Sequence, residues 1–93
     1  MTSKERAYLK GLAANVPALY QIGKEGITPN VIKSIDAALE ARELIKIHLL
    51  ENSLLDIRPT AEDLAKETAS QVVICIGSKI VLYRRSKKNI CEM

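Results

Sequence analysis

Apolar residues along the chain follow two different periods, and the changes between them predict seven elements. Apolar positions at helical spacing predict three helices, over residues 2–15, 29–42 and 59–69. Alternating or β-branched apolar runs predict four strands, over residues 18–22, 44–50, 72–76 and 79–84. The predicted order is therefore α-β-α-β-α-β-β.

This order predicts an α/β (α+β) fold, a single domain with a four-stranded mixed sheet. The two strand-helix-strand units require crossovers, which are right-handed by default. Gly77 and Ser78 join the last two strands as a two-residue turn with glycine first, which is typical of a type II′ hairpin. The chain of 93 residues has the size of one small domain. We expect that domain over residues 1–85 and a basic tail over residues 86–93.

The stretch over residues 22–29 is the strongest candidate for a binding site. Gly23 and Gly26 follow a predicted strand, and Thr28 and Pro29 are a good N-cap and first residue for the next helix. Glycine has no Cβ, so the backbone at both glycines can take positive φ and let a ligand come close to their N–H groups. Unpaired amides and the helix dipole favour an anion there, and Lys24 adds positive charge. The same pattern is also common in purely structural turns.

The charge of the chain points in the same direction but is local. The chain carries 14 Lys and Arg against 11 Asp and Glu, and the excess lies after residue 83. A basic cluster of this kind is typical either of contact with nucleic acid or of a solubilising tail. Three tyrosines are the only aromatic residues, so we do not expect base stacking to be the main binding device.

Several classes of protein are not indicated by the sequence. No stretch has the ~20 apolar residues of a membrane span, and the N-terminus lacks a signal-peptide pattern, so we expect a cytoplasmic protein. Cys75 and Cys91 lack metal or redox spacing, and we expect no disulfide, metal or cofactor. His48 is the only histidine and has no recognisable catalytic partners, so we expect no enzyme and no catalytic residues.

Four segments in this order resemble the YhbY-like, or CRM, domain, named for chloroplast RNA splicing and ribosome maturation. They are residues 9–13 (LKGLA), 22–28 (IGKEGIT), 38–46 (ALEARELIK) and 77–84 (GSKIVLYR). The resemblance covers about residues 3–85, leaves 51–58 without a motif, and is to the stand-alone prokaryotic form. It implies an RNA-binding domain similar in fold to the C-terminal domain of bacterial translation initiation factor 3. It also places the family's Gly-x-x-Gly loop, compared with the phosphate clamp of KH domains, on residues 23–26.

The resemblance implies a protein that associates with ribosomal RNA or precursors of the large ribosomal subunit (pre-50S) and acts in ribosome biogenesis. We expect RNA to be recognised through its phosphates and shape. A general RNA chaperone or regulator is the alternative. A small phosphate- or nucleotide-binding enzyme is less favoured, since the full Walker pattern is absent. A purely protein-binding module is a third possibility. We expect a monomer with no small-molecule substrate and no membrane contact.

The candidate RNA contacts fall into two sets. The expected phosphate site comprises Gly23, Lys24, Gly26 and Asn30, with the acidic Glu25 pointing away. The flanking basic candidates are Lys10, Lys33, Lys46, Arg84, Arg85, Lys87 and Lys88. Arg84 has the best support among the flanking set because it closes the last motif of the resemblance.

Overall fold

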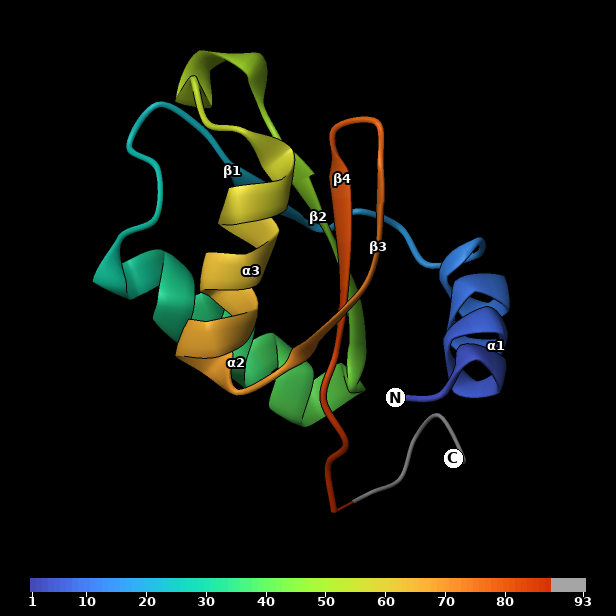
Figure 1. The fold of residues 1–93 in the computed structure, drawn as a ribbon. Coiled ribbons are helices and arrows are strands. Elements are labelled where there is room, and N and C mark those ends of the chain that lie inside the picture. Colours follow the sequence, from blue (N-terminus) through green and yellow to red (C-terminus); the bar gives the residue numbers. More distant parts are fainter. Residues whose placement is uncertain (88–93) are drawn as a thin grey trace.

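A four-stranded mixed sheet forms the middle of the fold in the computed structural model, which describes residues 1–87 (Figure 1). The strands are β1 (Tyr20–Ile22), β2 (Leu44–Leu49), β3 (Gln71–Ile76) and β4 (Lys79–Tyr83). Their spatial order is β1-β2-β4-β3, with β1 parallel to β2 and the other two pairings antiparallel. The predicted single α+β domain with a mixed four-stranded sheet is confirmed.

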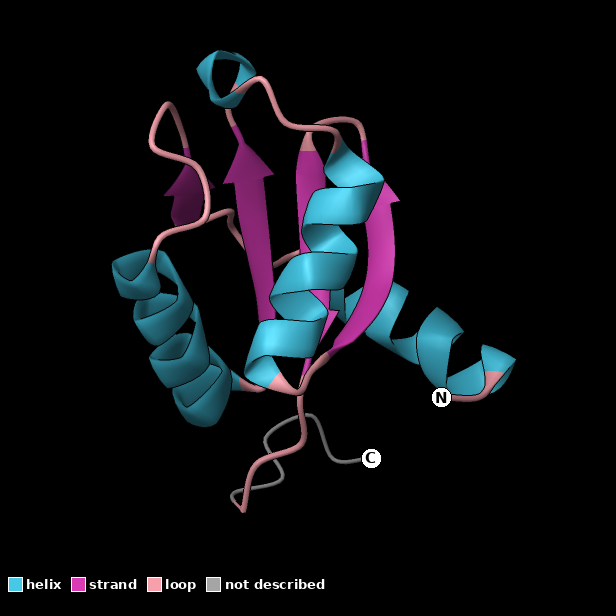
Figure 2. Ribbon diagram, turned by 60° about the vertical axis from the view of Figure 1, so that its left-hand side comes forward, coloured by secondary structure: helices cyan, strands magenta, loops and turns pink. Residues whose placement is uncertain are grey.

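Helices cover both faces of this sheet (Figure 2). Helix α1 (Ser3–Ala13) lies on one face, where it contacts β2 and β3. Helices α2 (Pro29–Arg42) and α3 (Ile57–Thr68) lie together on the other face and pack on each other. The chain order is the predicted one, with an added 3₁₀ turn, η1 (Glu51–Ser53), between β2 and α3.

The sheet therefore separates two apolar clusters. Ile45 and Ile47 of β2 pack into the larger cluster, beneath α2 and α3. Leu44 of the same strand packs with Leu9 and Ala13 of α1 in the smaller cluster. Alternation along one strand thus supplies both cores, because successive side chains point to opposite faces of a sheet.

Threonine side chains cap the starts of α1 and α2. The Thr2 hydroxyl accepts from the Glu5 N–H at 3.1 Å, and the Glu5 carboxylate accepts from the Thr2 N–H at 2.8 Å. These two bonds form a capping box. The bond from the Thr2 N–H is the main reason that the pKa of Glu5 lies below its ordinary value. At α2 the Thr28 hydroxyl accepts from the Val31 N–H at 3.1 Å, with Pro29 as the first helical residue.

Two predicted boundaries are wrong. Helix α3 begins at Ile57, two residues before Pro59, because proline is tolerated anywhere in the first turn, where its missing N–H has no helical partner. Strand β1 begins at Tyr20, since the Leu19 N–H donates to the Pro17 carbonyl at 3.1 Å and so turns residues 17–19 out of the sheet. The predicted hairpin is correct: Gly77 has φ 57° and Ser78 has no positive φ, which fits type II′.

Glu43 ties the end of the sheet to the chain that follows it. It ends α2 with φ 66° and is fully buried, and its carboxylate accepts from both the N–H (2.8 Å) and the hydroxyl (2.6 Å) of Ser86. Its carbonyl accepts from the Arg84 N–H at 2.9 Å. The first residue of the predicted tail is therefore held against the domain.

Over residues 1–87, no helix combines the length and the apolar character that a membrane span requires.

Candidate nucleic-acid interface

The glycine loop is a hydrogen-bonded turn between β1 and α2. The Gly26 N–H donates to the Gly23 carbonyl at 2.9 Å, which places Lys24 and Glu25 at an exposed tip. Gly26 has φ 68°, a conformation that residues with a Cβ rarely adopt. The Gly26 amide is therefore engaged within the turn.

Gly23 does not have positive φ. A Cβ at Gly23 would lie 3.3 Å from Asn52 Oδ1 and 3.4 Å from the Leu50 side chain, so a larger residue there would have to displace these side chains slightly. Leu55 lies against the other glycine, 3.8 Å from where a Gly26 Cβ would be. The connection after β2 thus forms one wall of the loop. Sequence reasoning missed this wall, because nothing in the pattern of residues 51–58 links it to a loop so distant in the chain.

Backbone donors remain available at the loop. Among residues 1–87, the N–H groups of Lys24, Glu25 and Asn30 have no protein acceptor. Thr28 caps α2 through the Val31 N–H and leaves the Asn30 amide exposed in the first turn. Unpaired amides at a helix N-terminus beside a lysine form an arrangement that can hold an anion.

The structure brings only part of the predicted contacts together. The loop end of the sheet holds Gly23, Lys24, Gly26, Asn30 and Lys33. The opposite end of the sheet holds Arg84, Arg85 and Lys87, as Figure 1 shows from the course of the red segment. Lys46 is half-buried on β2, on the face covered in part by α1, and Lys10 lies on α1. Lys88 lies outside the described residues.

Arg84 is engaged within the domain. Its guanidinium donates to the Thr68 carbonyl (2.8 Å), the Asp36 carbonyl (3.0 Å), the Asp36 carboxylate (2.5 Å) and the Glu40 carboxylate (3.3 Å). Its side chain is 19% exposed. These bonds join the end of β4 to α2 and to the end of α3. The geometry therefore gives Arg84 a structural role, away from the glycine loop.

The two sides of α2 differ in charge next to the loop. The groove between α2 and α3, about 930 Å³, is lined by Asp36, Asp63 and Glu67 together with Lys33. The hollow on the β1 side of α2, about 290 Å³, has Asn30 and no charged residue in its lining. Carboxylates repel phosphate. A polyanion held at the loop is therefore favoured along the β1 side.

The described residues offer little for catalysis. Burial raises the pKa of the Cys75 thiol, an effect opposed by the nearby Arg58 charge and reinforced by Glu62, so the thiol stays protonated at neutral pH. His48 is half-buried in β2. Within residues 1–87, no three His, Cys, Asp or Glu side chains gather closely enough to hold a metal ion.

The mixed sheet, the helices on both of its faces and the glycine loop at its edge make up a single small α+β domain. The sequence matches the CRS1 / YhbY (CRM) domain over residues 1–84, and the chain belongs to this family. It is 45% identical over 89 residues to the "Probable RNA-binding protein YqeI" of Bacillus subtilis, covering 96% of this chain and 93% of that protein. It is 31% identical over 88 residues to an "RNA-binding protein" of Haemophilus influenzae, covering 95% and 89% of the two chains.

A solved structure agrees with the fold. The chain resembles a hypothetical protein from Staphylococcus aureus, a candidate RNA-binding protein whose structure was determined in solution. The TM-score is 0.82 at 50% identity, over 96% of this chain and 93% of that one.

Replacement of Arg84 tests its structural role. We expect Arg84→Gln to lower the free energy of unfolding by about 2 kcal/mol, because the Thr68 and Asp36 carbonyls lose a charged donor in a partly buried site. The exposed Asp36 and Glu40 carboxylates add little to this value. Urea unfolding followed by circular dichroism gives the measurement.

The matched control is Arg85→Gln, at an exposed neighbouring position, where we expect a change within about 0.5 kcal/mol. An Arg84→Gln protein of unchanged stability that had lost affinity for RNA would instead make Arg84 an RNA contact.

Proposed function

We propose that this chain is a non-catalytic RNA-binding protein that holds the RNA backbone at the glycine loop. The observation that carries the proposal is the geometry of residues 23–30: a turn closed by the Gly26 N–H, exposed amides at Lys24 and Asn30, and a capped helix start. Backbone amides and lysine bind phosphate without reading sequence, so this site supplies affinity and register. RNA shape supplies the selectivity of this contact.

The membership of the CRM family supports RNA as the ligand, as do the names of the relatives. By resemblance to the stand-alone members of the family, the RNA is ribosomal RNA or a precursor of the large ribosomal subunit. The protein then acts as a cytoplasmic assembly factor. A general RNA chaperone would share the loop contact but bind many RNAs with little preference.

Substitution of Gly26 tests the loop. We expect Gly26→Asp to reduce RNA affinity about tenfold at physiological salt, because the new carboxylate repels phosphate at the turn. Fluorescence anisotropy with a labelled structured RNA measures the affinity.

The control is Gly77→Asp, at another glycine of positive φ (57° against 68°), in the β3–β4 turn. It carries the same added charge and similar backbone strain, and we expect RNA affinity within about twofold of the wild type. Equal affinities of the two folded variants would remove the loop from the RNA site.

The ribosomal role is tested by sedimentation of the tagged protein from a cell lysate, with and without RNase. We expect the protein to travel with immature large subunits and to be released by RNase. If RNase released the protein from many fractions of the gradient and the protein were not enriched in the fractions of subunit precursors, the chaperone alternative would be favoured. A protein that stays at the top of the gradient in both samples would contradict the ribosomal role.

A further inference from the structure

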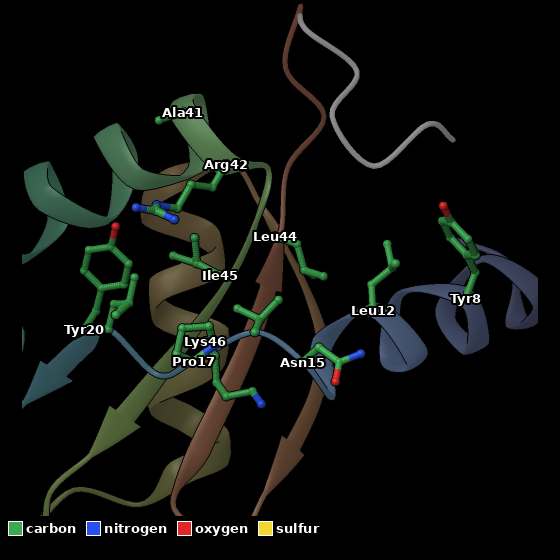
Figure 3. Close-up of a pocket in the computed structure, with 12 residues that line it drawn as sticks. Tyr8, Leu12, Asn15, Pro17, Tyr20, Ala41, Arg42, Leu44, Ile45 and Lys46 are labelled. Carbon is green, nitrogen blue, oxygen red and sulfur yellow. The ribbon is translucent and has the colours of Figure 1, made fainter.

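An apolar cleft of about 570 Å³ lies between the end of α1, the segment leading into β1 and the start of β2 (Figure 3). Tyr8 and Leu12 of α1 stand at one end of this cleft, and Tyr20 and Arg42 stand at the other. The helical pattern predicts Tyr8 and Leu12 among the apolar positions of α1, yet they are 45% and 36% exposed. The domain thus leaves part of the apolar surface of α1 uncovered.

The cleft lies at an open stretch of the sheet edge. Strand β1 has three residues and pairs with β2 from Ile47 onward, so the first residues of β2 have no β1 partner on that side. Leu44, Ile45 and Lys46 therefore line the cleft where a longer β1 would have covered them. An unpaired sheet edge offers backbone donors and acceptors to a ligand.

The charge of the cleft is purely positive. Arg42 and Lys46 are the charged residues of its lining, and within residues 1–87 neither forms an ion pair. The Asn15 side chain adds an amide, which can both donate and accept a hydrogen bond. The lining thus combines aromatic rings, an amide and two cations.

The cleft is continuous with the glycine-loop region. Leu19 and Tyr20 line both the cleft and the uncharged hollow that reaches Asn30 at the start of α2. From Asn30 to Arg42 helix α2 extends for roughly 18 Å. One strand of stacked nucleic acid rises about 3.4 Å per nucleotide, so this path fits on the order of five nucleotides.

We infer that the cleft binds an unpaired nucleobase of the RNA whose backbone is held at the glycine loop. The Tyr8 ring stacks on the base, the Asn15 amide meets its polar edge, and Arg42 and Lys46 contact the flanking phosphates. The inference rests on the proposed function and deepens it, because it gives the site a preference for single-stranded over duplex RNA. A duplex cannot enter, since its bases are stacked and paired.

The test compares two RNAs with the full chain: a hexa-adenylate and a blunt 12-base-pair RNA duplex. The double variant Tyr8→Ala/Leu19→Ala removes one ring and one apolar wall at positions 45% and 54% exposed, so the fold should survive. We expect about a tenfold loss of hexa-adenylate affinity and less than about a twofold change for the duplex. The control is Ile76→Ala, with 59% exposure outside the cleft, which should leave both affinities unchanged.

Tyrosine emission gives a second readout, because the chain has three tyrosines and no tryptophan. Stacking of adenine on a cleft ring should quench the emission of the wild type, and the double variant should lose most of this quenching. If the double variant lost the same affinity for both RNAs, or lost no affinity for either, the inference would be overturned. A wild-type dimer that the double variant converts to a monomer would also overturn it, since the cleft would then belong to a second copy.

Failure of the cleft and failure of the proposed function give different results. If the wild type binds both RNAs and the double variant binds each RNA with the affinity of the wild type, only the cleft assignment is lost. If the wild type binds neither RNA, the proposed function fails and the cleft assignment fails with it.

Discussion

The short parallel pairing of β1 with β2 shapes both parts of the proposed RNA site, the glycine loop and the cleft. Only Tyr20–Ile22 pair with β2, and the Leu50 N–H closes the pairing by donating to the Ile22 carbonyl at 2.9 Å. That bond fixes the chain immediately before Gly23, so the glycine loop projects from a rigid edge. Because β1 begins only at Tyr20, opposite Ile47, the first half of the β2 edge stays open and lines the cleft.

Charge then separates a favourable path from an unfavourable one. Both begin at the N-terminus of α2, but the path toward α3 meets three carboxylates, whereas the path along β1 meets none before Arg42 and Lys46. Among the described residues after β4, Arg84, Arg85 and Lys87 lie at the opposite end of the sheet, where the Arg84 side chain donates to α2 and to the end of α3. The net charge of the chain is therefore a poor guide to the site.

The sequence predicts the elements and the loop well because their determinants are local. Thr28 and Pro29 predict the start of α2 within a few residues, and alternation in β2 identifies the face that packs into the larger core. Contacts between distant segments could not be predicted in the same way. The packing of Asn52 against Gly23, the bonds of Arg84 and the exposure of Tyr8 all depend on which segments meet in space. Which basic residues contact RNA stays a prediction.

Amide chemical-shift mapping of the ¹⁵N-labelled chain during titration with a short single-stranded RNA shows directly whether RNA lies along β1. We expect the largest shifts to begin at Lys24 and Asn30, continue through Leu19 and end near Lys46, with little change at Asp63 or Arg85. Shifts concentrated between α2 and α3, or around residues 84–87, with the glycine loop unaffected, would contradict this path.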